Sequence, residues 1–183
     1  MSRYTIKHGH HRAKPLGLGL YLNKKTIAFK VLFDTSCKYH IDGEDMEDIN
    51  KLFGISYVPW YMAPLAMFSS VFLSLFRNQH HNDSARYGWR YNENLNKIEL
   101  FAYCYVDGKQ IRELITTVQF NQFHHMQINT TPTFYSFIVK KDGFEVTTQV
   151  QHNNSKKFGY PLGIYFGGNQ PAPKTITIEM KKL

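Results

Sequence analysis

The chain has 183 residues, which is enough for one domain with a hydrophobic core but short for two. Its 14 Phe and 12 Tyr favour β-sheet, because aromatic side chains pack well on a pleated surface. The formal net charge of +8 predicts affinity for an anionic partner. The basic residues are scattered rather than gathered in a dense run, which argues against a nucleic-acid-binding protein.

The N-terminal segment is basic and rich in histidine. It predicts a mobile arm over residues 1–15, followed by one domain over residues 16–183. His8, His10 and His11 could together bind a metal, but nothing nearby in the sequence orients their rings. We therefore expect neither a metal nor a cofactor. The first residues contain no apolar signal core, which predicts a cytoplasmic protein.

A hairpin and a helix are predicted next. Apolar residues at 18–22 and 27–33 flank a polar turn, a pattern typical of a β-hairpin. Residues 42–54 predict a short helix with Asp42 as its N-cap and Gly54 as its stop. The acids of its first turn suit the positive end of the helix dipole, so they do not require a metal or catalytic site. The apolar stripe of this helix consists of Met46, Ile49, Leu52 and Phe53.

Residues 55–76 form an uncharged block close to the length of about 20 residues that spans a bilayer. Pro59 and Pro64 argue against one continuous spanning helix. We expect a loop and then a short helix from Pro64, packed in the core or at an oligomer interface, with membrane contact and a true span as alternatives. The expected interface residues are Trp60, Phe68, Val71 and Phe72.

The most informative stretch is residues 80–91, where a polar turn leads into an alternating strand. Period-two alternation places Tyr87, Trp89 and Tyr91 on one face and the guanidinium groups of Arg86 and Arg90 on the other. The parallel N–H donors of a guanidinium group suit carboxylates, phosphates or sugar hydroxyls. The other interpretation is structural, with both arginines paired to acids elsewhere in the chain.

Further strands are expected after this one, separated by turn residues. Asp107-Gly108 and Asp142-Gly143 predict two hairpin turns. With roughly ten short strands, the sequence predicts an all-β fold, an antiparallel sandwich of jelly-roll type. The expected strands cover residues 97–106, 111–120, 124–129, 133–139, 144–150, 162–166 and 175–180.

The first of these strands is apolar on both faces, so it is either sandwiched or lines a pocket. Phe101, Tyr103 and Tyr105 share one face, where aromatic rings can stack on sugars or form part of the core. Cys104 and Cys37 lie in apolar surroundings and are expected to be core residues, with a disulfide between them left open.

Three segments, at residues 48–54, 80–90 and 165–173, together resemble a group of small bacterial and phage proteins without an established activity. In that pattern the predicted helix runs almost directly into the His80-His81 turn, so residues 55–76 resemble an insertion. The resemblance covers most of the chain and implies no particular chemistry.

A looser similarity is to jelly-roll polysaccharide lyases and glycan-binding modules. These carry an Arg-bearing strand and a late Tyr-Phe strand, whose counterparts here are Arg86, Arg90, Tyr165 and Phe166. The run Gln149-Val-Gln-His152 is only distantly similar to the Gln-x-His motif of the lyases. Resemblance at the level of the fold supports little about activity.

These observations predict a non-catalytic binding module for a glycan or another polar, anionic ligand. The alternatives are a self-assembling structural protein that uses residues 55–76 as its interface, and a lyase-like enzyme. In that enzyme Tyr165 or His81 would be the acid/base and Arg86 or Arg90 would stabilise an anion. The expected ligand-binding residues are His81, Arg86, Arg90, Tyr103, Tyr105, Tyr165 and Asn169.

Overall fold

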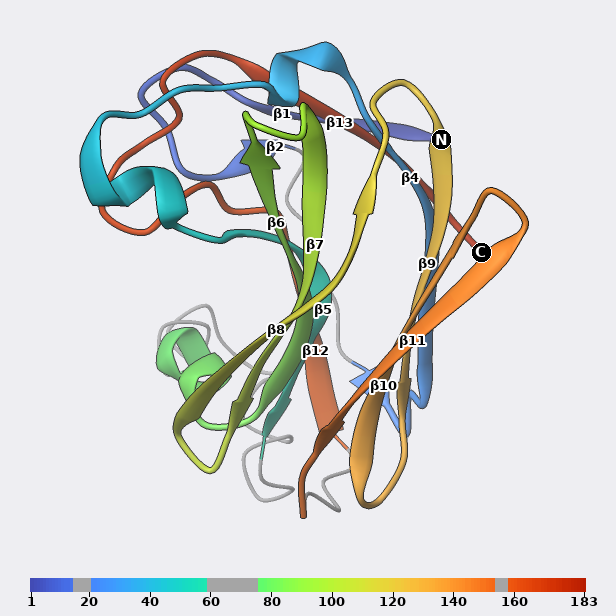
Figure 1. Cartoon of the computed structure of the whole chain (residues 1–183). Coiled ribbons are helices and arrows are strands. Elements are labelled where there is room, and N and C mark those ends of the chain that lie inside the picture. Colours follow the sequence, from blue (N-terminus) through green and yellow to red (C-terminus); the bar gives the residue numbers. More distant parts are fainter. Residues whose placement is uncertain (15–20, 59–75, 154–157) are drawn as a thin grey trace.

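A computed structural model describes residues 1–14, 21–58, 76–153 and 158–183. It shows two antiparallel sheets packed face to face (Figure 1), which confirms the predicted all-β sandwich of jelly-roll type. The seven-stranded sheet has the order β11 (Phe144–Gln151), β10 (Phe134–Lys141), β9 (Phe123–Thr130), β4 (Thr26–Phe33), β13 (Ile176–Lys182), β1 (Ser2–Ile6), β2 (Ala13–Lys14). The six-stranded sheet has the order β3 (Tyr21–Leu22), β12 (Phe158–Leu162), β5 (Asn50–Val58), β6 (Ser84–Asn92), β7 (Lys97–Val106), β8 (Lys109–Val118).

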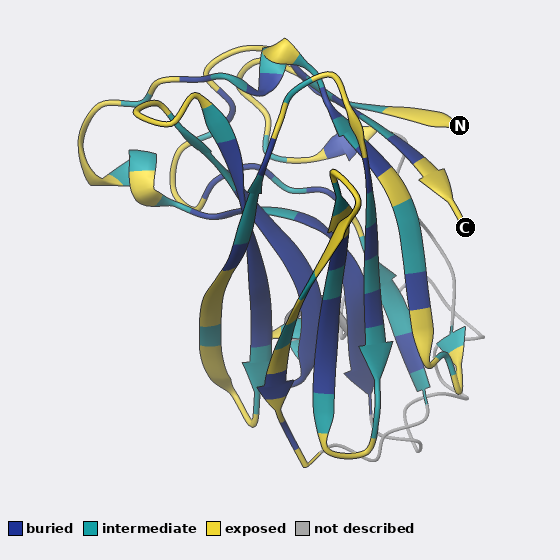
Figure 2. Ribbon diagram, turned by 45° about the vertical axis from the view of Figure 1, so that its right-hand side comes forward, coloured by how far each residue is buried: buried dark blue, intermediate teal, exposed yellow. Residues whose placement is uncertain are grey.

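The hydrophobic core lies between the two sheets. Tyr87 and Trp89 project into it from β6 and are fully buried against Phe137 and Phe33 of the other sheet. Figure 2 shows the same distribution, with buried residues in the middle of the sandwich and exposed residues mainly at turns and ends. These two aromatic residues of β6 are therefore core residues and not a ligand platform. Cys37 and Cys104 are free thiols in this core.

Both predicted hairpin turns are present. Asp107 and Gly108 adopt positive φ angles of 49° and 77° and connect β7 to β8, with Val106 paired to Lys109. Asp142-Gly143 connects β10 to β11 in the same way. Two consecutive residues with positive φ match the twist of the flanking strands, which is why Asp-Gly is a reliable hairpin signal.

The first predicted hairpin is wrong. β3 pairs with β12 in the six-stranded sheet, whereas β4 pairs with β9 and β13 in the seven-stranded sheet. Tyr21–Leu22, the described end of the first run, and β4 belong to opposite sheets, and residues 18–20 lie outside the described residues. Alternation identifies a strand from its own residues and does not name its partner.

The helix predicted over residues 42–54 is also wrong in extent and type. Its first part is a short 3-10 helix, η2 (Gly43–Glu47), and the rest belongs to β5. A β-bulge between Lys51 and Gly54 inserts an extra residue, so that Leu52 and Phe53 both reach the core while Ile49 packs on the outer face. The bulge therefore produced an apolar spacing that resembles a helical stripe.

Residues 1–14 differ from the expected arm. β1 pairs with β13 along its full length, and β2 pairs with β1. The N-terminal segment is consequently an integral part of the seven-stranded sheet.

The uncharged block is described only at its two ends. Residues 55–58 are the end of β5, and Phe76 begins the 3-10 helix η4 (Phe76–His81). The expected interface residues Trp60, Phe68, Val71 and Phe72 lie outside the described residues. Among the described residues, no helix is long and apolar enough to cross a membrane.

Candidate functional site on the outer face of the six-stranded sheet

Strand register gathers polar and aromatic side chains on the outer face of the six-stranded sheet, away from the core. One row across the strands runs from Gly54 through Arg86 and Tyr103 to Arg112. Residues directly opposite one another in antiparallel strands point to the same face, so each row presents one continuous surface. We call this surface the Arg86 face; it comprises Lys51, Ser56, Ser84, Arg86, Tyr103, Tyr105, Gln110, Arg112 and Tyr160.

Arg86 is the central residue of this face and is only 7% exposed. One terminal nitrogen, Nη2, donates to the carbonyl of Leu52 at 3.1 Å and also to the carbonyl of Gly163. Among the described residues Arg86 has no ion pair, and its Nε has no hydrogen-bond partner. Burial lowers the pKa of Arg86 to about 10, opposed by the neighbouring phenol of Tyr103. A guanidinium group is thus held away from water without a counter-charge, which is costly unless a ligand supplies one.

The β5 bulge shapes the position of Arg86. The disrupted ladder at the bulge frees backbone groups, and the Leu52 carbonyl there becomes an acceptor for Arg86. Gly54 lies directly opposite Arg86, and an added Cβ at Gly54 would sit 2.2 Å from the Cβ of Arg86. Glycine is therefore required here for the close approach of β5 to the arginine.

Lys51 adds a second cation to the Arg86 face. Its Nζ donates to the Gly167 carbonyl at 3.0 Å and lies 5.3 Å from the centre of the Tyr103 ring. Burial lowers the pKa of Lys51 to about 8, and the nearby charges of Arg86 and Arg112 lower it further, whereas Asp48 opposes them. Lys51 is therefore mostly charged at neutral pH and loses its proton at a lower pH than an ordinary lysine does.

Tyr103 and Tyr105 stand beside the cations and share one partner. The side-chain amide of Gln110 donates to both phenol oxygens, at 3.0 Å for Tyr105. Burial raises the pKa of Tyr103, so its phenol keeps its proton. The ring of His81, in η4, meets the ring of Tyr105 edge-on with centroids 4.8 Å apart, and η4 lies against β5 (Figure 1).

Arg90 lies on the same face of β6 but in a different environment. Its Nε and Nη2 donate to one carboxylate oxygen of Glu99 at 2.9 and 2.7 Å, and its Nη1 contacts the Glu47 carboxylate. The guanidinium also lies 5.4 Å from the centre of the Phe101 ring. Arg90 is therefore paired with acids of the chain, as the structural interpretation expected. Arg86 has no such pair among the described residues and remains the candidate for ligand binding.

The segment that contains Tyr165 is fixed to the start of β5. Lys51 and Tyr165 exchange backbone hydrogen bonds of 2.7 and 2.9 Å, so their side chains share a face. The Gly167 and Gly168 amides donate to the side chains of Asn50 and Asp48. This contact joins two of the motifs of the sequence analysis, residues 48–54 and 165–173.

Tyr165 therefore adjoins the Arg86 face, although its ring is stacked on His11 at 5.0 Å. Phe166 is fully buried in the core, and Asn169 is exposed in the loop that follows. Of the expected ligand residues, Arg86, Tyr103, Tyr105 and His81 lie together, Tyr165 is adjacent to them, and Arg90 is paired with acids. Ligand binding by any of the seven expected residues, including Asn169, stays a prediction.

The Gln149–His152 run is not part of this face. Its glutamines lie on β11, an outer strand of the other sheet, and the buried ring of His152 stacks on Tyr135 at 3.9 Å. Its similarity to the lyase motif therefore has no counterpart beside Arg86. In the described part of the chain, no group of three or more His, Cys, Asp or Glu side chains is placed to hold a metal. The expected absence of a metal stays a prediction.

Sequence reasoning missed Lys51, Gln110, Arg112 and Tyr160. Lys51 was hidden inside the predicted helix, and no local motif marks the others. Gln110 and Arg112 follow the Asp107-Gly108 turn, so pairing the two strands outward from that turn would have placed them opposite Tyr105 and Tyr103. Lys51 and Tyr160 depend on the bulge and on the contact between β5 and β12.

No model of a known protein family matches this chain, and no curated protein sequence matches it. Solved structures do match. The alginate lyase from Klebsiella pneumoniae has a TM-score of 0.54 at 10% identity, over 86% of this chain and 59% of that one. Alginate lyase AlyC3 has a TM-score of 0.55 at 10% identity, over 98% of this chain and 72% of that one. AlyC3 in complex with dimannuronate has a TM-score of 0.53 at 12% identity, over 99% of this chain and 74% of that one.

At these identities the likeness shows a shared fold, the jelly-roll sandwich of polysaccharide lyases. The chain spans 59% of the length of the Klebsiella enzyme. A fold of this kind hosts more than one function, so the function of this chain must be argued from its own side chains.

Proposed function

We propose that this protein is a non-catalytic binding module for an anionic glycan, and that the glycan binds on the Arg86 face. The observation that supports this most strongly is the buried guanidinium of Arg86, which has no ion pair among the described residues. A carboxylate from a ligand that binds over this face would supply the missing counter-charge. Without such a ligand, the two backbone hydrogen bonds of Arg86 must offset the cost of burying its charge.

The charges on the face favour a polymer with repeated negative groups. Arg86 and Arg112 are two strands apart in one row, a separation of about 10 Å from the usual strand spacing. Lys51 is a third cation near Arg86, and its Nζ donates to the Gly167 carbonyl. A chain of sugar acids that crosses the strands would present carboxylates to these cations in turn.

The remaining groups favour a sugar over a simple anion. Tyr103, Tyr105 and Gln110 present hydroxyl and amide groups that can exchange hydrogen bonds with sugar hydroxyls. Aromatic rings also stack on the apolar faces of sugars. The structural likeness to alginate lyases, one of them in complex with dimannuronate, agrees with this class of ligand but is evidence for the fold alone.

Calorimetry with a matched pair of ligands tests the proposal. β-1,4-linked tetramannuronate and neutral β-1,4-mannotetraose differ chiefly in their carboxylates. We expect saturable binding of the anionic tetramer and much weaker binding of the neutral one. Arg86→Met should weaken binding by more than about tenfold, whereas Arg3→Met, at an exposed arginine paired with Glu179, should leave it unchanged. Equal affinity of the Arg86→Met variant and the wild type would contradict the proposal.

A lyase-like enzyme is the second candidate, because Lys51 has a pKa of about 8 beside Arg86 and Tyr103. In a β-elimination, the neutral Lys51 amine would take the proton from C5 of a uronate while Arg86 stabilises the carboxylate. The C4–O bond would break, a C4=C5 double bond would form, and a phenol such as that of Tyr103 would protonate the leaving oxygen. Ultraviolet absorbance of the unsaturated product in the same tetramannuronate mixture separates the two candidates.

Self-assembly through residues 55–76 was the other alternative. Its expected interface residues lie outside the described residues, so this alternative stays a prediction.

A further inference from the structure

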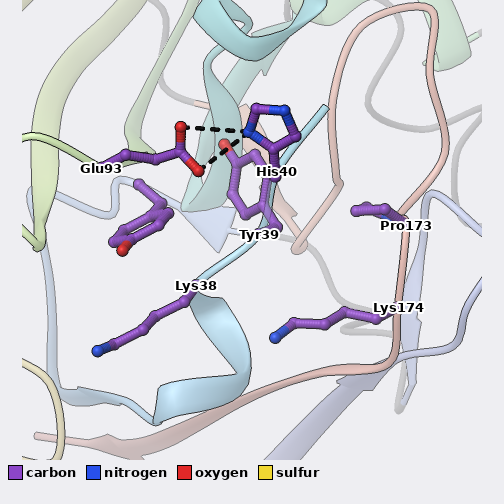
Figure 3. A pocket seen from close by; sticks show the side chains of 7 residues that line it. Lys38, Tyr39, His40, Glu93, Pro173 and Lys174 are labelled. Atoms are coloured by element: carbon purple, nitrogen blue, oxygen red, sulfur yellow. Dashed lines mark hydrogen bonds and ion pairs between the residues drawn. The ribbon is translucent and has the colours of Figure 1, made fainter. Parts of the chain in front are cut away.

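A pocket of about 410 Å³ lies at the far end of β6 from Arg86. Tyr91, which lines it, follows Arg86 by five residues along the strand, or about 17 Å. We call it the Lys38 pocket; it is lined mainly by Lys38, Tyr39, His40, Tyr91, Glu93 and Lys174 (Figure 3). Its volume lies within the range that holds small ligands. It shares no lining residue with the Arg86 face.

The lining of this pocket is positively charged. Lys38 and Lys174 have no ion pair among the described residues, whereas the Glu93 carboxylate is engaged by the His40 ring at 3.0 Å. In Figure 3 the two lysines stand on the opposite side of the pocket from the His40–Glu93 pair, with the Tyr39 ring between them. Hydrogen bonds to Glu93 and Asp42 raise the pKa of His40, and the two lysines of the lining outnumber its one glutamate. The Lys38 ammonium lies 5.0 Å from the centre of the Phe120 ring, a contact that does not neutralise it, so the charge that a ligand would meet is that of the two ammonium groups.

The base of the pocket is aromatic and rigid. The rings of Tyr39 and Tyr91 have centroids 6.2 Å apart, and Tyr39 is 5% exposed. The Tyr39 hydroxyl accepts a hydrogen bond of 2.8 Å from Asn50, whose own carbonyl oxygen accepts from the Gly167 amide. Pro173 adds a further apolar wall. These contacts hold the rings in place, so a ligand need not order them on binding.

We propose that the Lys38 pocket is a second binding site, and that it takes a single sugar ring bearing one carboxylate, such as a free hexuronate. The ring would lie against the tyrosines and Pro173, and the carboxylate would face Lys38 and Lys174. The hydroxyls would reach the Glu93 carboxylate, whose oxygens accept hydrogen bonds, whereas both ring nitrogens of His40 already contact Glu93 and Asp42. This proposal does not depend on the function of the Arg86 face.

Amide-resolved NMR titration with sodium glucuronate tests it, with glucose as the neutral control. We expect saturable shifts at Tyr39, Tyr91 and Pro173's neighbour Lys174 with glucuronate, and much smaller shifts with glucose. The double variant Lys38→Gln/Lys174→Gln should weaken glucuronate binding by about tenfold or more, since two charged hydrogen-bond donors are lost. A matched variant of two exposed lysines on the other sheet, Lys30→Gln/Lys182→Gln, should bind as the wild type does.

Arg86→Met separates this site from the first one. Unchanged glucuronate shifts around Tyr39 in that variant support an independent pocket, whatever becomes of tetramannuronate binding. The proposal is overturned if glucuronate causes no saturable shifts at the pocket, if glucose binds equally well, or if the Lys38→Gln/Lys174→Gln variant retains full affinity.

Discussion

Arg86 and Arg90 occupy the same face of the same strand, four positions apart, yet their surroundings differ completely. Arg90 binds Glu99 through two nitrogens and also contacts Glu47. Arg86 is more deeply buried and meets backbone carbonyls and tyrosines instead of acids. A charged group whose partner lies within the fold contributes to structure, whereas a buried charge without one marks a candidate ligand site.

The same comparison applies to the two ends of the outer face. At the Arg90 end, positive and negative side chains meet and the surface is closed by its own contacts. At the Arg86 end, Lys51 and Arg112 add positive charge, and burial together with the charges of Arg86 and Arg112 lowers the pKa of Lys51. Among the described residues, Arg90 has acidic partners and Arg86 has none. Substitutions at Arg90 should therefore change stability, and substitutions at Arg86 should change ligand binding.

The largest expected effect concerns the inner face of β6, which fixes the position of both arginines. Trp89 is fully buried between them on the core side, in contact with Phe33. Trp89→Ala should cost about 3–5 kcal/mol of the free energy of unfolding, because a large aromatic is removed from a packed core. Urea denaturation measures the change. Leu114→Ala, at a residue 55% exposed on β8, is the control and should have little effect; equal stability of both variants would place Trp89 outside the core.

Arg90→Met should destabilise the fold by about 3 kcal/mol, because it leaves the Glu99 carboxylate buried without its cation. Asn92 still donates to Glu99 at 2.8 Å, which limits the loss. The double variant Arg90→Met/Glu99→Met should recover most of the stability in the same denaturation measurement. If the single variant were as stable as the wild type, the structural role assigned to the Arg90–Glu99 pair would be wrong.

Arg86→Met should change the free energy of unfolding by less than about 1 kcal/mol, since relief of an unpaired buried charge offsets two lost hydrogen bonds. The affinity for tetramannuronate should nevertheless fall by more than about tenfold, because a charged interaction with the ligand is lost. Thermal unfolding and calorimetry on the same sample measure both effects. A large loss of stability with unchanged affinity would reverse the roles assigned to Arg86 and Arg90.

The smallest expected effect is on the pH dependence of binding. Lys51 is charged below its pKa of about 8 and neutral above it. An anionic ligand favours the charged form, so binding couples to proton uptake and the affinity should fall by a few fold as the pH rises through 8. Arg86, with a pKa of about 10, stays charged over this range. Calorimetry at pH 6.5 and 9 checks this, and the dependence should flatten in Lys51→Met.

Much of the fold was readable from local residue patterns. Period-two alternation identified β6 and gave the bounds of β7, and two Asp-Gly pairs identified the β7–β8 and β10–β11 hairpin turns. Alternation also placed Arg86 and Arg90 on the face opposite Trp89. Each of these features depends on neighbours in the chain, because side-chain direction and turn geometry are local properties.

Other features required contacts between distant segments. Nothing in residues 18–33 indicates that β3 and β4 belong to opposite sheets. The β5 bulge, which brings Lys51 and Gly54 to the Arg86 face, gave the sequence a helical spacing and concealed the strand. Short apolar runs support either interpretation until their partners are known.

The sequence by itself determined a sandwich of short strands, its hairpin turns, and two arginines on one face of β6. Only the tertiary structure decided which arginine has an acidic partner: Glu99 lies opposite Arg90 and Tyr103 opposite Arg86. It also decided that Lys51, Gln110 and Arg112 join Arg86. The physical reason is that charge pairing and burial depend on which strands meet and in what register, and neither is encoded in the alternation of a single strand.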